Sequence, residues 1–150
     1  FRHQLLLVGF RRWKFKDDMA LIEELGLQDE VLELGYVDDA DLPAIYNLAD
    51  CFILPSFYEG FGIPILEAQA CGCPVVVGNR GAMVEVAGEG GAVNFDPDRP
   101  PELADRIGRI LNDECLRASL VEKGFANAAR YGWDITARQT VALFEKIGGG

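Results

Sequence analysis

The sequence is poor in histidine and in basic residues, and it has no long apolar run. Its only histidine, His3, cannot build a histidine-based zinc site, and neither Ser56 nor Ser119 has a histidine suitably placed for a Ser/His/Asp triad. Lysine and arginine number 14 against 24 aspartates and glutamates, which gives a net charge of −10 at pH 7. This acidic balance argues against a nucleic-acid surface or an anionic-membrane anchor. No stretch has the length of a membrane span, and no signal peptide is visible.

Cysteine is also sparse, with four in 150 residues. Cys51 lies in an apolar run and is expected to be a small core residue. Cys71 and Cys73 flank Gly72, and with Cys115 they form no pattern of four zinc ligands, so we expect no metal site. Reduced thiols predict a cytoplasmic protein, with the full-length parent able to lie at the inner face of the membrane.

Short apolar runs alternate with helical segments along the chain. Strands are predicted at 4–9, 31–35, 51–54, 74–77 and 91–95. Helices are predicted at about 17–25, 42–48, 65–70, 82–87, 103–111, 114–130 and 134–147, with Trp133 and Phe144 expected in the core. This alternation predicts an α/β fold, a parallel sheet with helices on both faces, over residues 1–147, followed by a glycine tail at 148–150.

The most informative stretch, residues 55–67, follows the third predicted strand. Gly60 and Gly62 lie in the turn between that strand and the next helix. Glu59 lies in the turn and Glu67 one turn into the helix, with seven residues between them. The stretch therefore combines backbone amides at a helix start with two carboxylates.

Amides and carboxylates suit different parts of a ligand. Glycines let a ligand approach the backbone, and free N–H groups at a helix start attract phosphate. A carboxylate repels phosphate but accepts hydrogen bonds from hydroxyls, so Glu59 and Glu67 are expected to bind vicinal diols. A diphosphate on amides, with sugars on carboxylates at either end, describes a nucleotide-sugar.

Residues 59–68, followed by 71–76, resemble the E-x7-E signature of the retaining GT-B glycosyltransferases, the glycosyl transferases group 1. Similar residues of that family occur at Gly35, Tyr36, Val37, Leu42, Tyr46, Ala49, Asp50, Glu85, Asp96 and Pro97. The resemblance covers residues 4 to 145 and implies the Rossmann-like, donor-binding, carboxyl-terminal domain of such an enzyme. It also implies that the first strand–helix unit of that domain is missing. Because the chain begins at Phe1, we expect a fragment.

The resemblance implies a hexosyltransferase of polysaccharide biosynthesis, such as a mannosyltransferase. It would move a sugar from a nucleotide-diphospho-sugar, GDP-mannose or a UDP-sugar, to an acceptor glycan or lipid with retention of configuration. The acceptor would bind through a missing amino-terminal domain, so the fragment alone is expected to be inactive. Neither a metal nor another cofactor is expected, nor membrane insertion by this chain.

The resemblance also assigns roles to single residues. It makes Glu59 the catalytic group, which binds donor-sugar hydroxyls, and gives Glu67 the ribose diol. The backbone amides assigned to the sugar and diphosphate are those of Gly60, Phe61, Gly62 and Ile63. Tyr36 and Val37 are assigned to the nucleobase, the alternative being packing at a strand end.

Two other classes of protein stay open. One is another GT-B enzyme, such as a nucleotide-sugar epimerase or a phosphorylase, although no lysine has a context that suits the pyridoxal phosphate of a phosphorylase. The other is a non-catalytic nucleotide-binding module. Asp96-Pro97-Asp98 matches the D-x-D metal motif of a different glycosyltransferase fold, but its position before a helix favours a turn.

Overall fold

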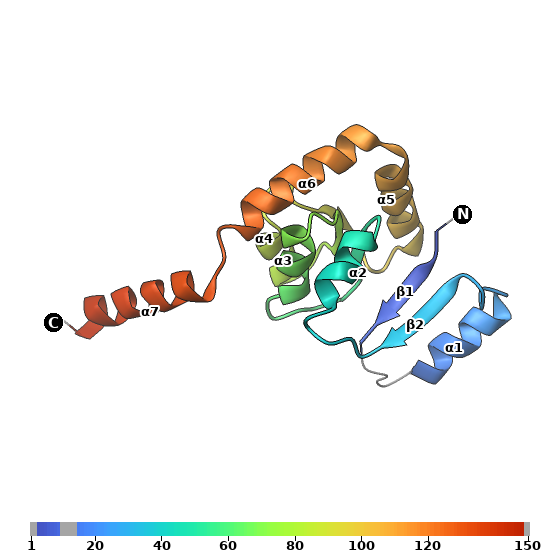
Figure 1. The fold of residues 1–150 in the computed structure, drawn as a ribbon, viewed down its shortest axis with the longest axis horizontal. Coiled ribbons are helices and arrows are strands. Elements are labelled where there is room, and N and C mark those ends of the chain that lie inside the picture. The colour runs from blue at the N-terminus through green and yellow to red at the C-terminus, as the bar shows by residue number, and fades with distance from the viewer. Residues whose placement is uncertain (1–2, 10–14, 149–150) are drawn as a thin grey trace. The chain divides into compact units, whose positions relative to one another are not determined.

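A computed structural model describes residues 3–9 and 15–148, which fall into two compact units, 1–42 and 43–150. The strands are β1 (Leu5–Val8), β2 (Val31–Gly35), β3 (Phe52–Leu54), β4 (Val75–Gly78) and β5 (Val93–Phe95) (Figure 1). The helices are α1 (Phe15–Glu24), α2 (Leu42–Leu48), α3 (Ile63–Ala70), α4 (Ala82–Ala87), α5 (Pro100–Asn112), α6 (Glu114–Ala128) and α7 (Trp133–Gly148). Every predicted strand and helix is present; β2, α2 and α4 have the predicted ends, and the ends of the others differ by a few residues. Of the predicted glycine tail, Gly148 ends α7 and residues 149–150 lie outside the described residues, so the domain boundaries stay a prediction.

All strand pairs in the described chain are parallel, which confirms the α/β prediction. β1 pairs with β2 in one sheet, and β3, β4 and β5 form a second sheet with β4 in the middle. A single sheet was expected, and the described strands form two. Among the described strands, β4 has two pairing partners, and β1, β2, β3 and β5 have one each.

The first unit is a strand–helix–strand arrangement. Leu5 lies beside Val31, and the register shifts between Leu7 and Val8. Apolar side chains of both strands are exposed within this unit, among them Leu5 and Leu32. An apolar strand with side chains on both faces is typical of the interior of a parallel sheet.

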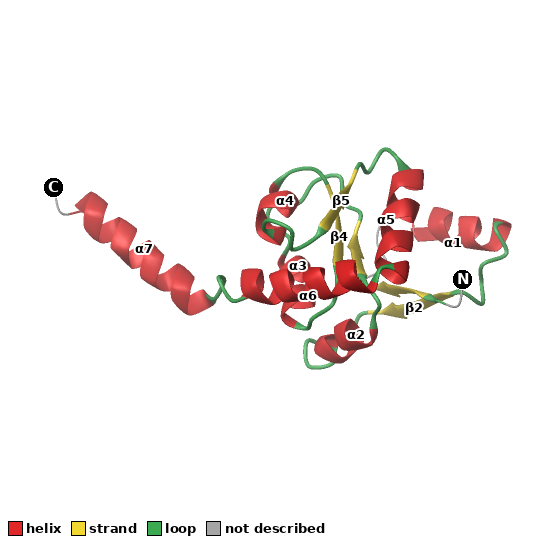
Figure 2. Cartoon of the chain, turned by 90° about the horizontal axis from the view of Figure 1, so that it is seen from above, coloured by secondary structure: helices red, strands yellow, loops and turns green. Residues whose placement is uncertain are grey.

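The core of the second unit surrounds β4. Val75, Val76 and Val77 are each 0% exposed, because β4 has a strand on either side and helices over both faces. Val76 packs in a cluster with Phe95 of β5, Ile110 of α5 and Leu120 of α6. Figure 2 shows α4 and α5 on opposite sides of β4 and β5. Burial on both faces explains why β4 is a continuous apolar run without polar alternation.

A buried pair of amide side chains joins three helices of this unit. Gln69 Nε2 donates to the carbonyl oxygens of Ala87 (2.8 Å) and Gly91 (3.0 Å). Asn127 Nδ2 donates to Gln69 Oε1 and to the carbonyl oxygen of Val86, both at 2.8 Å. Since Gln69 lies on α3, these bonds fix the helix that follows the Glu59 turn against α4 and α6.

The prediction that Trp133 and Phe144 lie in the core is wrong. Trp133 is 84% exposed, Phe144 is 67% exposed, and no residue of α7 is buried. Apolar periodicity indicates that a helix has an apolar stripe, but it does not say what packs against that stripe.

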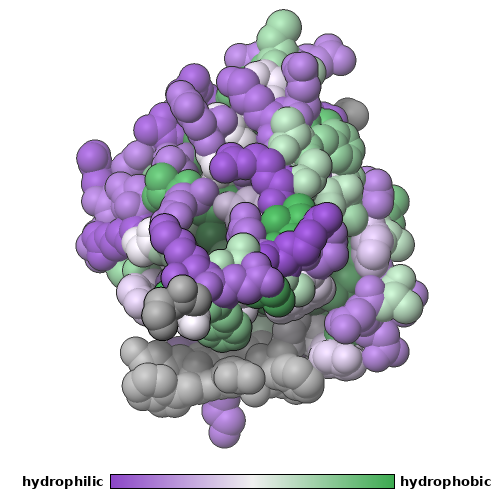
Figure 3. Space-filling view, turned by 90° about the vertical axis from the view of Figure 1, so that its left-hand side faces the viewer, coloured by the Kyte–Doolittle hydropathy of each residue, from purple (hydrophilic) through white to green (hydrophobic). Residues whose placement is uncertain are grey.

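Polar side chains cover much of the face displayed in Figure 3, with hydrophobic ones in smaller groups between them. This surface agrees with the acidic, charge-rich composition. Within residues 3–9 and 15–148, none of the helices combines the length and the apolar character that crossing a membrane requires.

Candidate functional site

The turn that carries Glu59 ends at Gly62, whose backbone conformation other residues rarely adopt. Gly62 is the N-cap of α3 and has φ 96°, in the left-handed region. A Cβ at this position would lie 2.9 Å from Ile65 Cδ1. Both facts favour glycine, and together they set the direction in which α3 leaves the turn.

Two further glycines lie against this turn, and one of them allows a close approach. A Cβ on Gly78, at the end of β4, would lie 2.7 Å from the carbonyl oxygen of Ser56. A Cβ on Gly81, at the start of α4, would lie 3.5 Å from the carbonyl oxygen of Glu59. The carboxyl end of β4 and the start of α4 therefore support the turn, at the edge of a parallel sheet where ligands commonly bind.

The carboxylate of Glu59 is held within its own turn. Ser56 Oγ donates to Glu59 Oε1 at 2.8 Å. Glu59 is half-buried, and its second oxygen accepts no hydrogen bond from the described residues. Ser56 was considered only as a nucleophile from the sequence; its spacing of three residues from Glu59 is the signal that could have predicted this bond.

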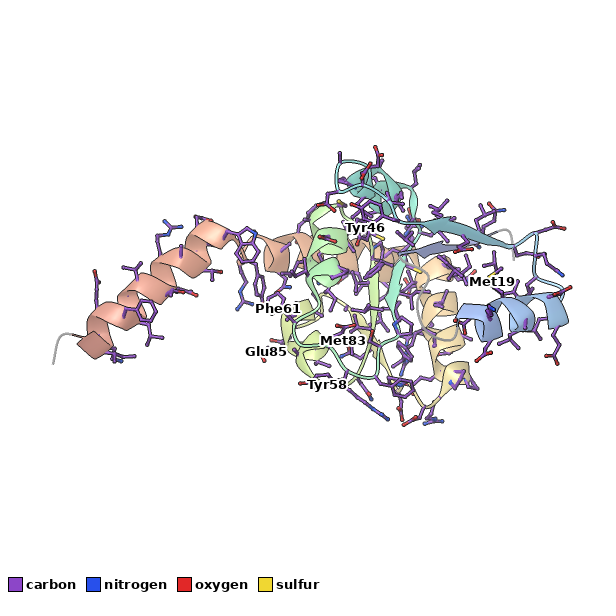
Figure 4. All side chains as sticks on the ribbon, turned by 90° about the horizontal axis from the view of Figure 1, so that it is seen from below. Met19, Tyr46, Tyr58, Phe61, Met83 and Glu85 are labelled. Atoms are coloured by element: carbon purple, nitrogen blue, oxygen red, sulfur yellow. The ribbon has the colours of Figure 1, made fainter. Side chains whose placement is uncertain are left out.

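The carboxylate of Glu67 is held from another helix. Tyr46, on α2, is labelled in Figure 4. Its Oη donates to Glu67 Oε2 at 3.1 Å. Burial raises the pKa of Tyr46 well above its usual value, and the charge of Glu67 raises it further, so the phenol stays protonated. The sequence predicted that Tyr46 packs, which its burial confirms, but no local pattern predicted its bond to Glu67, 21 residues away.

The four predicted backbone amides lie at the start of α3. The first helical bond runs from Ile65 N to the carbonyl oxygen of Gly62. Within the described part of the chain, the N–H groups at positions 60–63 donate to no protein acceptor. A Cβ on Gly60 would meet nothing within 4 Å, so a ligand has room to approach the backbone there. Phe61, beside it, makes an edge-to-face contact with Tyr131 at 5.9 Å between ring centroids.

A cation missed from the sequence lies beside the turn. The Arg80 guanidinium lies 5.6 Å from the centroid of the Phe57 ring and donates to Asp96 Oδ1 at 3.0 Å. It also donates to Asp98 Oδ2, so Arg80 holds both acidic residues of the D-x-D pattern. Across the described residues no three His, Cys, Asp or Glu side chains lie close enough together to hold a metal ion.

The other predicted residues follow β2 or lie on α4. Tyr36 is 57% exposed and Val37 half-buried, and both follow β2 in the first unit, so their place at this site stays a prediction. Glu85 is exposed on α4 (Figure 4). All four cysteines are free, as expected.

Most of the chain is similar to proteins of known family. Residues 3–126 match the family described as Glycosyl transferases group 1. O-antigen chain mannosyltransferase B from Escherichia coli is 38% identical over 146 residues, which cover 97% of this chain and 38% of that protein.

Two solved structures share the fold at high coverage. Sucrose-phosphate synthase from Thermosynechococcus elongatus gives a TM-score of 0.87 at 30% identity, over 97% of this chain and 39% of the synthase. HepE from Anabaena, in complex with UDP, gives 0.83 at 27% identity, over 99% of this chain and 41% of HepE. The chain thus spans about two fifths of the length of each of these proteins.

Proposed function

The chain belongs to the Glycosyl transferases group 1 family, and from that premise we propose that it is the donor-binding part of an enzyme that uses a nucleotide-diphospho-sugar. The observation that supports this most is the turn between β3 and α3. It presents backbone N–H groups without protein acceptors in the described chain, with Glu59 before them and Glu67 after them. This order suits a diphosphate with a sugar on either side.

Each part of the donor has an expected partner. Glu67 binds the ribose diol, and Glu59 binds hydroxyls of the transferred sugar. The amides of residues 60–63, with the positive end of the α3 dipole behind them, bind the sugar and diphosphate. Tyr36 and Val37 are proposed to contact the nucleobase.

The proposed reaction retains the anomeric configuration and needs no metal ion. The charge that develops on the leaving diphosphate is stabilised by amides and side chains, and Glu59 stabilises the positive charge of an oxocarbenium-like sugar. A carboxylate held by Ser56 in a fixed orientation suits this task, because preorganised groups lose little energy in reorienting. Comparing the anomeric configuration of donor and product by NMR tests retention, and an inverted product would contradict it.

The donor sugar is proposed to be mannose, carried by GDP, with a UDP-sugar as the alternative. The name of the Escherichia coli relative, a mannosyltransferase, supports mannose. Structures of Anabaena HepE with UDP and with UDP-glucose support the alternative. The acceptor, a glycan or lipid, is proposed to bind outside this chain, and the cytoplasmic location stays a prediction.

The test is the Glu67→Ala variant of the full-length protein. Loss of the carboxylate should weaken binding of both the nucleoside diphosphate and the nucleotide-sugar by about 1.5–3 kcal/mol, the range for hydrogen bonds to a charged group. Calorimetry with GDP, UDP and their sugars measures this change. Glu122→Ala, an exposed glutamate on α6, is the matched control and should bind normally. Unchanged affinity of Glu67→Ala for the nucleoside diphosphate would rule out the role of Glu67.

A further inference from the structure

We propose that Tyr46 is a positioning residue for ribose recognition: its hydroxyl holds one oxygen of Glu67, which orients the carboxylate toward the diol of the nucleotide. This inference rests on the proposed role of Glu67. It adds a residue of α2 to the site, at a position that the E-x7-E motif does not include.

The geometry joins a buried donor to an exposed acceptor. Tyr46 is 9% exposed, and its ring makes an edge-to-face contact with Phe52 of β3, with centroids 5.5 Å apart at 84°. Glu67 is exposed on α3, and its Oε2 lies 3.1 Å from Tyr46 Oη. The hydroxyl is therefore anchored through its ring to β3, while the glutamate that it holds is exposed.

Such an anchor matters because an exposed glutamate is otherwise free to move. A glutamate side chain has several rotatable bonds, and ordering it on ligand binding costs conformational entropy. A hydrogen bond already present in the free protein reduces that cost, so the ligand finds the carboxylate in its binding orientation. Removing the bond should therefore weaken ligand binding without removing the carboxylate.

The phenol is also chemically suited to the task. An ionised carboxylate only accepts hydrogen bonds, and its two oxygens offer about four acceptor positions. Tyr46 uses one position on Oε2. No other described side chain donates to Glu67, so Oε1 and the second position of Oε2 remain for the two hydroxyls of a vicinal diol. Because burial and the charge of Glu67 raise the pKa of Tyr46, the phenol stays protonated and remains a donor at neutral pH.

The test compares ribonucleotide and 2′-deoxyribonucleotide binding in the full-length protein. Tyr46→Phe keeps the ring and its contact with Phe52 but removes the hydroxyl. Calorimetry measures the Kd of GDP, UDP and their 2′-deoxy counterparts for wild type and variant. We expect the ribonucleotide to bind about 3- to 30-fold more weakly to Tyr46→Phe, as for the loss of one hydrogen bond. We expect the 2′-deoxynucleotide to weaken by a smaller factor, since it keeps only one of the two hydroxyls that the oriented carboxylate would bind.

Three further measurements make the result decisive. In the Tyr46→Phe/Glu67→Ala double variant, removal of the hydroxyl should cause no additional loss, because both changes act through one carboxylate. KM for the donor should rise while kcat stays within about 2-fold, because the lost interaction is equal in ground and transition states. Tyr131→Phe removes a phenol hydroxyl that makes no bond to Glu67, and it should keep the wild-type ratio of the two Kd values.

The outcomes separate this inference from the proposed function. If wild type does not distinguish ribonucleotide from 2′-deoxynucleotide, or if Glu67→Ala distinguishes them as well as wild type does, the role of Glu67 itself fails. If Glu67→Ala loses the distinction while Tyr46→Phe keeps it, only the role of Tyr46 fails. Equal weakening of both nucleotides by Tyr46→Phe, or loss of folding in this variant, would show a structural role and overturn the inference.

Discussion

At the scale of single residues, the fold holds the two glutamates in different ways. Glu59 is half-buried and bonded to Ser56 of its own turn, whereas Glu67 is exposed and bonded to Tyr46 of a separate helix. A carboxylate within the turn is suited to the sugar end of the donor, and one inside α3 is suited to the nucleoside end. Substituting Glu59 should therefore lower turnover, whereas substituting Glu67 should weaken nucleotide binding.

Glu59→Gln in the full-length protein should leave nucleoside diphosphate affinity nearly unchanged. Turnover should fall by about 10²-fold or more, the usual effect of removing one preorganised electrostatic group. Measuring kcat, Kd and melting temperature on the same sample decides between a catalytic and a structural role. Glu89→Gln, an exposed glutamate in a turn, is the control. A large fall in melting temperature with normal turnover per folded molecule would contradict the catalytic role.

Two buried or half-buried thiols in the second unit should make the protein less stable at alkaline pH. Burial raises the pKa of Cys51 to about 11 and of Cys73 to about 12, both from 9.0. A raised pKa in the folded state gives stability that is complete below the unfolded pKa and is lost as pH rises through the folded one. The free energy of unfolding should therefore fall above about pH 9, by at most about 1.4 kcal/mol per pH unit for each group.

Urea denaturation between about pH 8 and 11 measures this slope. Cys73→Ala should reduce the slope, because one of the contributing thiols is gone. Cys115→Ala should leave it unchanged, because Cys115 is exposed. Stability that does not change across this interval would show that the buried thiols are not shifted in this way.

At the scale of elements, the amide pair Gln69 and Asn127 ties the helix that carries Glu67 to its neighbours. Apolar contacts are not directional, whereas these four hydrogen bonds at 2.8–3.0 Å specify one arrangement of α3, α4 and α6. The position of α3, and with it that of Glu67, therefore depends on side chains that are not among the predicted ligand contacts.

Asn127→Ala should lower the free energy of unfolding by about 1–3 kcal/mol, because it leaves Gln69 Oε1 and the Val86 carbonyl buried without their donor. Denaturant titration measures the change. The control is Asn112→Ala, since Asn112 donates to the carbonyl oxygen of Gly108 at an exposed site. It should change stability by less than about 0.5 kcal/mol. Equal effects of the two substitutions would show that the buried network adds nothing beyond an exposed bond.

At the scale of the whole molecule, the chain accounts for only part of its relatives. It covers 38% of the Escherichia coli mannosyltransferase and 41% of Anabaena HepE. The donor site proposed on α3 would hold one substrate, and transfer requires a second. The proposed activity therefore belongs to the full-length protein.

We expect purified residues 1–150 to catalyse no sugar transfer from GDP-mannose, UDP-glucose or another nucleotide-sugar. The reason is that an acceptor site and any groups it contributes to the reaction are proposed to lie outside this chain. Mass spectrometry of candidate acceptors after incubation measures the product, with the full-length protein as positive control. A glycosylated product formed by the 150-residue chain would show that it contains a complete active site.

Much of the fold and the position of the candidate site followed from the sequence alone. Alternating apolar and helical segments predicted every strand and helix, because the period of a strand or helix determines the spacing of apolar residues along the chain. The turn with Glu59, Gly62 and Glu67 was recognisable for the same reason, since its residues are close together in the chain. Their roles as ligand contacts remain predictions.

Only the tertiary structure decided which distant side chains meet. The bond from Tyr46 to Glu67, the pairing of Arg80 with Asp96 and the exposure of Trp133 left no signal in the local pattern. Such contacts depend on how whole helices and strands pack, and packing is set by surfaces that form only when segments distant in sequence come together. The same reason explains why an apolar stripe predicted α7 correctly as a helix and wrongly as part of the core.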